Sequence, residues 1–420
     1  MMQYNSLFKK IFLGTMLATS IALVGCGSDD NDDSYVFKPD EPKYELYVKH
    51  QPYKGGDVPA YATSIDVMSY KMPYVNGKTQ EATAMVMVPK TATQPKDGWR
   101  VVVWAHGTTG VGDSCAPSNN PLGKNFGILA NSLLDQGYII LAPDYEGLGT
   151  TGIHPYLNLA SESQSAIYAV KALKERLGTS LNGQWMSIGQ SQGGHASLGI
   201  AEFAAQDVTY QGAVATAPAS SLGYIITQIA PTAIAGLEQS LSKEAAAVVY
   251  AELLSYAAYA AVGIKAADSN FDYAVMFKPR ALAIAKNAEG TTGDNGLCLT
   301  DMITQYAVDI QKFLAEDSKN KVMDYPAFID GFEKNATVAK FLQESQPGTK
   351  ALKKPVYVVQ GARDAAVPYQ VTTALVENLN ALGSSPKVIL DVVEGAGHTE
   401  AIVQRNTEVV NFIKKYMPAK

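Results

Sequence analysis

The chain has 420 residues, and a hydrophobic share of 47% is enough to bury a large core, as expected of a globular, enzyme-sized protein. At about 150 residues per domain, this length predicts roughly two or three structural units. The formal net charge of -6 offers no basic stripe for a phosphate backbone, so we expect no nucleic acid partner.

The N-terminus has the pattern of an export signal. Lys9 and Lys10 precede the apolar stretch IFLGTMLATSIALVG, which is too short and too close to the N-terminus for a convincing spanning helix. The residues LVGC, at 23–26, resemble the processing site of a bacterial lipoprotein, in which the cysteine becomes the lipid-bearing first residue. We therefore expect removal of residues 1–25 and attachment through Cys26 to a membrane of the bacterial envelope, at the outer membrane or cell surface. An ordinary cleaved leader is the alternative.

An acidic segment and two further cysteines follow the predicted anchor. Residues 26–50 begin with CGSDDNDDS, whose acidic run has no large apolar residue, and are expected to form a solvated tether. Export favours oxidation of thiols, and Cys115 and Cys298 are the only remaining pair, so we expect a disulfide between them. Two unpaired buried thiols are the alternative. No CxxC motif or His-rich cluster is present, so no metal site is expected.

The hydrophobic pattern after the tether predicts an α/β fold with a doubly wound, mostly parallel sheet. The stretches AYATSIDVMSYKM and EATAMVMVP alternate polar and apolar residues, which is typical of antiparallel strands. Later strands are expected to be parallel and buried on both faces, because their sequences are short apolar runs: VVVWA, YIILAP, QWMSIG, GAVATAP, PVYVVQG and KVILDVV. Helix-like segments separate these runs, as in a doubly wound sheet.

The alternation of strands and helices stops at residues 221–350. This segment, rich in alanine and tyrosine, predicts a helical cap inserted between two parts of the core, residues 51–220 and 351–420. Because it lies between two parallel strands, we expect it above their carboxyl ends, where open α/β sheets bind ligands. Residues 245–263 are apolar enough to suggest a membrane span, but Glu252 lies among them and most of their apolarity is alanine. A helix buried in the cap, or facing a lipid-like substrate, is the preferred interpretation.

The motif GQSQGG, at residues 189–194, makes Ser191 the candidate nucleophile. In a GxSxG sequence between a strand and a helix, the serine occupies a sharp turn whose flanking glycines let neighbouring backbone approach. A glycine-rich turn without chemistry would have a similar sequence, so the partners of the serine decide between the two interpretations. A serine hydroxyl needs a base to take its proton, and an imidazole is suited to that work.

His398, in EGAGHTE after the last expected strand, is the predicted base. A loop in that position can bring the imidazole over the serine, whereas His195 follows the serine by one helical turn and is expected to pack beside it. A surface loop histidine is the alternative for His398, and the remaining histidines are His50, His106 and His154. Asp364, in QGARDAAVP, is the predicted carboxylate that orients the imidazole. Asp144, in APDYEGLG, is the competing acid, for which we expect a structural role in its loop.

Two backbone N–H groups are expected to bind the oxyanion that develops on the attacked carbonyl. One belongs to Gln192, next to the nucleophile. The other comes from the loop HGTTG after the VVVWA run, where Thr108 is the first choice and Thr109 the second. A simple glycine-rich strand-to-helix turn is the alternative for this loop.

Six segments, spanning about residues 100–400, together resemble α/β-hydrolases of the secretory lipase family, the lipase-A-like group of fungi and bacteria: WAHGTTG, SCAPS, DYEGLGTTGIHPYL, GQSQGG, GARDAAVP and GAGHTE. The resemblance implies that fold, a triad in the chain order Ser191, Asp364 and His398, and ester substrates. Related enzymes of this kind act on lipids, acyl esters or polyesters. HGTTG differs from the sequence of the fungal enzymes at the oxyanion loop.

These observations predict an exported, lipid-anchored serine carboxylester hydrolase, a lipase or esterase that forms an acyl-enzyme on Ser191 and needs no cofactor. Its expected partners are a small-molecule or lipid ester substrate and the membrane that holds the anchor. A peptidase or amidase on the same fold is one alternative. A lipoprotein that kept the fold as a non-catalytic binding module is another.

Overall fold

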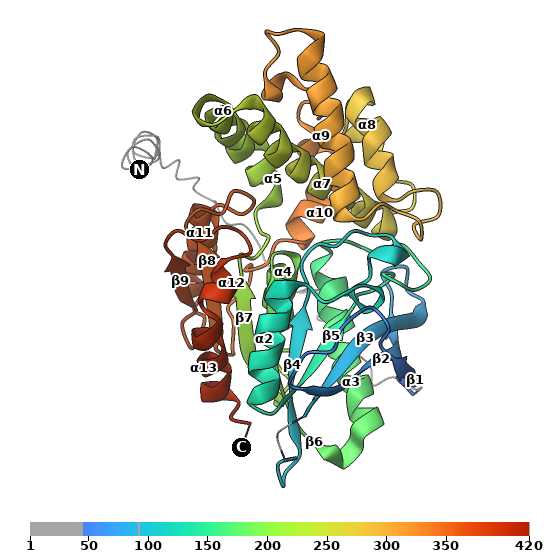
Figure 1. Cartoon of the computed structure of the whole chain (residues 1–420), viewed down its shortest axis with the longest axis vertical. Helices are drawn as coiled ribbons and strands as arrows, with labels where there is room; N and C mark the ends of the chain where they lie inside the picture. Colours follow the sequence, from blue (N-terminus) through green and yellow to red (C-terminus); the bar gives the residue numbers. More distant parts are fainter. Residues whose placement is uncertain (1–44, 91–92, 420) are drawn as a thin grey trace, which may run out of the picture. The chain divides into compact units, whose positions relative to one another are not determined.

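A nine-stranded mixed sheet forms the centre of the computed structural model, which describes residues 45–90 and 93–419 (Figure 1). The strand order is β1-β2-β3-β5-β4-β6-β7-β8-β9. The predicted signal peptide, the anchor Cys26 and most of the predicted tether lie outside the described residues.

The first strands of the sheet are antiparallel, as their alternating sequences predicted. They are β1 (Tyr47–Pro52), β2 (Ala62–Pro73) and β3 (Thr79–Pro89), and β3 also pairs antiparallel with β5 (Tyr138–Pro143). The last residues assigned to the tether belong to this sheet, because His50 pairs with Met68 of β2.

The remaining strands pair in parallel with their neighbours: β4 (Trp99–Ala105), β6 (Leu181–Gln190), β7 (Tyr210–Thr216), β8 (Val356–Gly361) and β9 (Ile389–Val393), with β5 joined to β4. Every residue of β4, β5 and β8 is buried, as the continuous apolar runs predicted. The exception is β9, whose Ile389 is 47% exposed because this strand lies at the edge of the sheet.

Helices cover both faces of the sheet, which confirms the doubly wound architecture. Two separate cores result from the alternation of side chains along the strands. In β4, Val101 and Val103 belong to the core on one face, and Val102 and Trp104 to the core on the other. The first core includes α3 (Leu159–Leu177), α4 (Gln192–Phe203) and α11 (Tyr369–Ala381). The second includes α2 (Lys124–Asp135), α12 (Ala401–Gln404) and α13 (Asn406–Tyr416).

A helical insertion with its own core lies between β7 and β8, at the carboxyl ends of the strands (Figure 1). It consists of α5 (Leu222–Tyr224), the π-helical η4 (Ile225–Ile229), α6 (Ala230–Ser240), α7 (Lys243–Ala267), α8 (Pro279–Ala285), α9 (Leu299–Glu316) and α10 (Ala336–Glu344). Short 3-10 turns complete the chain: η1 (Asp113–Cys115), η2 (Pro117–Asn119), η3 (Gly178–Ser180), η5 (Tyr273–Val275), η6 (Lys286–Ala288), η7 (Val322–Asp324) and η8 (Phe332–Lys334).

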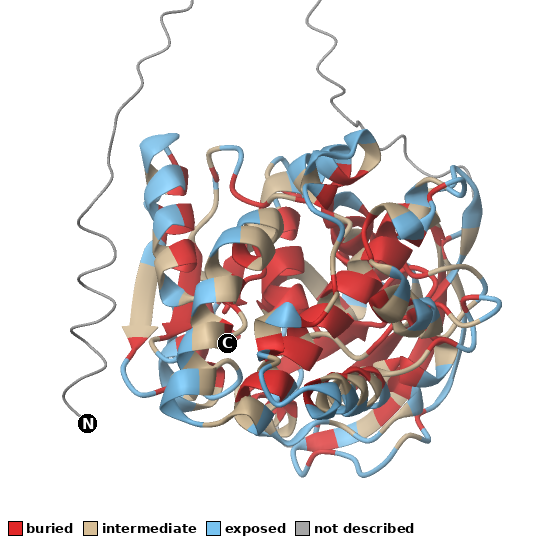
Figure 2. Ribbon diagram, turned by 90° about the horizontal axis from the view of Figure 1, so that it is seen from above, coloured by how far each residue is buried: buried red, intermediate tan, exposed pale blue. Residues whose placement is uncertain are grey.

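Helix α7 is the central helix of this cap. It begins at the N-cap Ser242, whose side chain accepts a hydrogen bond from the Ala245 N–H. Among the described residues it is the one helix long and apolar enough to cross a membrane, but 72% of its most apolar window is buried inside the protein. Figure 2 shows that buried residues fill the interior of the described chain and exposed residues its outer surface. The apolarity of α7 is therefore accounted for by packing within the cap.

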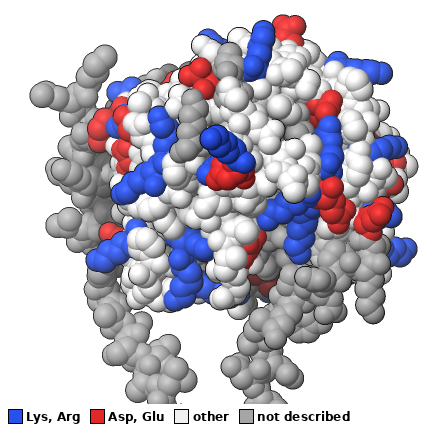
Figure 3. All heavy atoms as spheres, turned by 90° about the horizontal axis from the view of Figure 1, so that it is seen from below, with Lys and Arg blue, Asp and Glu red and all other residues white. Residues whose placement is uncertain are grey.

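Charged side chains of both signs are interspersed on the face seen from below (Figure 3). Lysine and arginine side chains are scattered over this face with aspartate and glutamate among them, and broad areas of uncharged residues separate them.

Candidate active site

Ser191 occupies a strained turn between β6 and α4. Its φ of 60° and ψ of -116° lie in a region that residues other than glycine rarely adopt. The flanking glycines are required by space, because a Cβ on Gly189 would collide with the backbone oxygen of Gly193, and one on Gly193 with that of Ala105. The turn therefore presents the serine at the carboxyl end of β6, as the motif predicted.

The structure brings Ser191, His398 and Asp364 together. The Nε2 atom of His398 lies 2.8 Å from Ser191 Oγ, and its Nδ1 lies 2.8 Å from Asp364 Oδ2. Asp364 also accepts hydrogen bonds from the Gln360 side chain and from the N–H groups of Ala366 and Val367. With Nδ1 donating to the carboxylate, Nε2 is free to accept the serine proton.

The other candidates for base and acid have structural partners instead. Asp144 is fully buried and accepts hydrogen bonds from Thr83 Oγ1 at 2.7 Å and from the Ser118 N–H at 2.9 Å, and burial raises its pKa. It therefore joins its loop to β3 and to the segment around Ser118. His195 is also fully buried and contacts Glu162 and the backbone of Ser345. The remaining three histidines form hydrogen bonds with groups other than Ser191: His50, His106 and His154.

The predicted oxyanion donors lie on the two segments that meet at the serine. A Cβ on Gly107 would lie 3.7 Å from Ser191 Cβ, so the HGTTG loop runs directly beside the nucleophile. Tyr156 anchors this loop through a 2.7 Å hydrogen bond between its hydroxyl and Thr108 Oγ1. Gln192 is the first residue of α4, where a backbone N–H has no acceptor within the helix. The backbone of the HGTTG loop and that of the first turn of α4 thus both lie beside Ser191.

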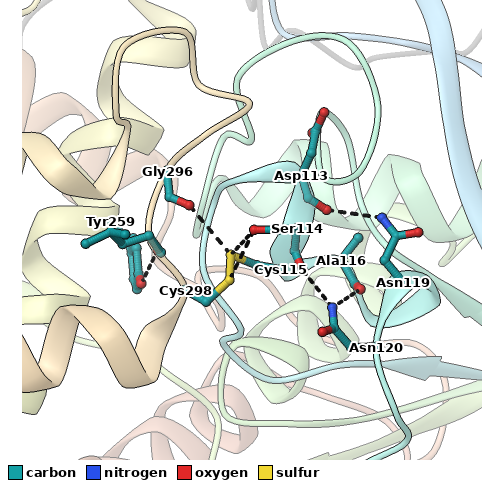
Figure 4. Close-up of a disulfide and its surroundings, with 10 residues drawn as sticks. Asp113, Ser114, Cys115, Ala116, Asn119, Asn120, Tyr259, Gly296 and Cys298 are labelled. Atoms are coloured by element: carbon teal, nitrogen blue, oxygen red, sulfur yellow. Dashed lines mark hydrogen bonds between the residues drawn. A yellow bond between two sulfur atoms is a disulfide. The ribbon is translucent and has the colours of Figure 1, made fainter. Parts of the chain in front are cut away.

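A disulfide links Cys115 and Cys298, with a Cα–Cα distance of 5.4 Å (Figure 4). The alternative of two unpaired thiols is therefore wrong. The bond connects the loop after β4 to the cap, and Gly110 forms an isolated β-bridge with Cys298 beside it. The Leu299 N–H also donates to the Thr109 oxygen at 2.9 Å. The segment of the cap around Cys298 is therefore held against the HGTTG loop.

An apolar cavity extends from Ser191 into the cap. About 810 Å³ of space free of protein atoms lies between its walls, a figure that includes open solvent at the mouth. Helices α5, η4, α7 and α10 form the cap side, and the loops before α3 and after β7 and β8 form the core side. Leu253 lines the cavity, whereas its neighbour Leu254 is buried in the core of the cap. Most of the residues that line the cavity are apolar.

Strained backbone is concentrated around the same place. Among the described residues, five other than glycine have positive φ, and they follow β5, β6 and β7 at the carboxyl edge of the sheet: Tyr145, Leu157, Ser191, Ala217 and Ser221. Such conformations cost about 1 to 3 kcal/mol each and tend to cluster at functional sites. The described residues contain no group of three or more His, Cys, Asp or Glu side chains arranged to hold a metal.

One part of the site was missed by the sequence interpretation. Glu162, in the first turn of α3, is fully buried and contacts both Gln192 and His195. The available signal was an acidic residue in the serine-rich first turn of the helix, but Gln192 and His195 lie about thirty positions away in the chain.

Comparison with solved structures identifies the fold. The esterase LipA from Xanthomonas oryzae, described as rice cell wall degrading, matches with a TM-score of 0.60 and 17% identity over 89% of this chain and 98% of that chain. A protein of Legionella pneumophila matches with a TM-score of 0.63 and 18% identity over 89% of this chain and 98% of that chain. This chain has the α/β-hydrolase fold.

Two further comparisons agree with an α/β-hydrolase. Lipase A of Candida antarctica, in its closed state, matches with a TM-score of 0.61 and 15% identity over 87% of this chain and 83% of that chain. A family model described as TAP-like protein matches residues 334–419, which contain Asp364 and His398. No curated protein matches the sequence. The predicted fold is confirmed, and the lipase-like neighbours agree with the resemblance found in the motifs.

Proposed function

We propose that this α/β-hydrolase is a serine carboxylester hydrolase, a lipase or esterase that forms an acyl-enzyme on Ser191. The observation that carries the proposal is the continuous hydrogen-bonded series from Ser191 through His398 to Asp364, opening into an apolar cavity. A buried carboxylate, an oriented imidazole and a serine on a strained turn together form an activated nucleophile.

The reaction proceeds in two halves. Ser191 Oγ attacks the ester carbonyl while His398 Nε2 takes its proton, and the N–H groups of Gln192 and Thr108 bind the resulting oxyanion. His398 then gives the proton to the departing alcohol, which leaves an acyl-serine. A water molecule attacks this ester with His398 again as base, and the carboxylic acid leaves as Ser191 regains its proton. Asp364 stabilises the imidazolium in both halves, and the chemistry needs no cofactor.

The cavity supports an ester with an apolar acyl chain as substrate. Only three of its lining residues have side chains with hydrogen-bonding groups, namely Tyr156, Ser191 and Tyr256. A peptide chain would leave its amide groups without partners there, and burying such groups is costly. Each acyl methylene removed from water is worth about 0.8 kcal/mol, close to fourfold in specificity when realised at the transition state. The esterase and lipase among the structural neighbours add support.

A paired substrate set tests this proposal. The mature protein should hydrolyse aryl esters and react covalently with a fluorophosphonate probe, while matched aryl amides should be hydrolysed far more slowly. Ser191→Ala should abolish both ester turnover and labelling. Faster turnover of the amides would favour a peptidase or amidase. A wild-type protein that neither labels nor hydrolyses any ester would favour a non-catalytic binding module.

We also propose that the protein is exported and held at a bacterial membrane by a lipid on Cys26. This residue lies outside the described residues, and the proposal is supported by LVGC after a charged and apolar leader. Metabolic labelling with a fatty acid should mark the wild-type chain and not Cys26→Ser. A soluble, unlabelled wild-type protein in the culture medium would indicate an ordinary leader.

A further inference from the structure

The side chain of Gln192, the residue that follows the nucleophile, is held by two buried partners. Its Nε2 donates to Glu162 Oε1 at 2.8 Å and to His154 Nε2 at 3.1 Å. Gln192 is 1% exposed, and Glu162 and His154 are both 0% exposed. Both amide hydrogens are therefore engaged, and the side chain is fixed in one orientation.

The acceptor role of His154 follows from its other ring nitrogen. Nδ1 lies 2.9 Å from the backbone oxygen of Glu146, which can only accept a hydrogen bond. The proton of the neutral ring is therefore on Nδ1, and the lone pair of Nε2 faces Gln192. Burial lowers the pKa of His154 to about 4, so the ring keeps this form at neutral pH.

Glu162 is fixed in turn by groups from the loop before α3 and from α4. Its Oε1 also accepts the Leu157 N–H at 3.0 Å, and its Oε2 lies 2.8 Å from His195 Nδ1. His195 Nε2 lies 2.8 Å from the backbone oxygen of Ser345, just after α10. The two ring nitrogens of His195 thus lie within hydrogen-bonding distance of Glu162 and of the Ser345 backbone oxygen. The side chains of Glu162 and His195 are both fully buried.

We propose that Glu162 is a positioning residue for ester hydrolysis, acting through the Gln192 side chain to hold the Gln192 N–H in line with the oxyanion. The inference rests on the proposed function. An oxyanion donor is effective because it is oriented before the reaction, and a shift of about 1 Å can cost up to 10²-fold in rate. The hydrogen bonds of α4 do not hold this N–H, since it belongs to the first residue of the helix. The clamp on the side chain supplies the missing restraint.

Two variants distinguish an effect on the position of the Gln192 N–H from a loss of folding stability. Gln192→Met removes both donors but keeps the backbone N–H. Glu162→Gln keeps the size of the side chain. Its carbonyl can accept from Gln192 and Leu157 and its amide can donate to His195 Nδ1, while the carboxylate that strengthens these hydrogen bonds is lost. The matched control is Glu202→Gln, on α4, the helix that begins with Gln192. Glu202 accepts the Gly348 N–H at 2.9 Å, and burial raises its pKa.

Steady-state kinetics with a short aryl ester and inhibition by an alkylboronic acid provide the readout, with thermal unfolding as the check on folding. The boronate forms a tetrahedral adduct with the serine and places an oxygen where the oxyanion develops. We expect kcat to fall about tenfold or more for Gln192→Met and about three- to tenfold for Glu162→Gln, with KM unchanged. Boronate affinity should fall by the same factor as kcat/KM, and Glu202→Gln should match the wild type.

Three results would overturn the inference: folded variants with wild-type kcat, a loss confined to KM, or an equal loss in Glu202→Gln. A merely structural role would lower the unfolding temperature without the parallel loss of boronate affinity. If Gln192→Met does not fold, Glu162→Gln decides by the same criteria. A wild-type protein without ester turnover would refute the proposed function, and this inference with it, whereas an active wild type with equally active variants refutes the inference alone.

Discussion

Ser191 Oγ and His398 Nε2 lie 2.8 Å apart although 207 positions separate the two residues in the chain. The first belongs to the turn after β6, and the second to the loop after β9, at the same edge of the sheet. The cap is inserted between them in the sequence, and its helices line the cavity that reaches Ser191.

Ser191→Ala should lower ester turnover by roughly 10⁵ or more without changing the unfolding temperature, because the members of a triad act as one unit. His398→Ala should cost nearly as much. The measurement is initial rate on an aryl ester beside a thermal unfolding curve.

The matched control for the base is His50→Ala, because His50 is exposed on β1 and contacts Tyr47. Its activity should equal that of the wild type. Retention of more than about a tenth of the activity by His398→Ala would exclude this histidine as the base.

The acyl preference should depend on the cavity wall formed by α7. We expect kcat/KM for aryl esters to rise from acetate to at least butyrate or hexanoate, and Leu253→Asp to flatten that rise, because Leu253 lines the cavity. Val248→Asp is the control on the same helix, since Val248 is 50% exposed and lies outside the cavity. Acetate as the best wild-type substrate would instead indicate a small acyl pocket.

Removing the disulfide should destabilise the protein. The two cysteines are separated by 183 positions, and in the chain-entropy model closing so long a loop contributes about 4 to 5 kcal/mol, an upper figure for most measured cases. Denaturant unfolding of the Cys115→Ser, Cys298→Ser double variant checks this. Alkylation of both thiols in the unreduced mature chain would show that the bond does not form.

Stability should decline between acid and neutral pH through Glu146. Burial raises the pKa of Glu146 to about 7, against the ordinary value of 4.5. The folded protein therefore retains a proton that the unfolded chain releases, and the resulting stability is complete below pH 4.5 and lost as the pH rises through about 7. The effect is on the order of 3 kcal/mol.

Glu146→Gln isolates this contribution, because glutamine cannot ionise but preserves the acceptor for the Val75 N–H. The free energy of unfolding, measured by denaturant titration from pH 5 to pH 8, should fall more steeply for the wild type than for the variant. Parallel curves would show that Glu146 does not titrate in this range.

The sequence by itself determined the parallel strands, the position of the cap and the candidates Ser191, Asp364 and His398. These features follow from local patterns, since a continuous apolar run needs burial on both faces and a GxSxG turn needs its small residues at fixed positions. Strand β9 is an exception to the expectation of full burial. Its apolar run KVILDVV resembles those of the buried strands, but β9 lies at the edge of the sheet and is partly exposed.

Only the tertiary structure decided which side chains meet. Leu253 and Leu254 are adjacent and chemically identical, and both are buried in the core of the cap, but only Leu253 also lines the cavity. The clamp of Glu162 and His154 on Gln192 joins α3, the loop before it and α4. A buried hydrogen bond depends on distance and direction between atoms that the chain brings together only when it folds, so no spacing in the sequence encodes it.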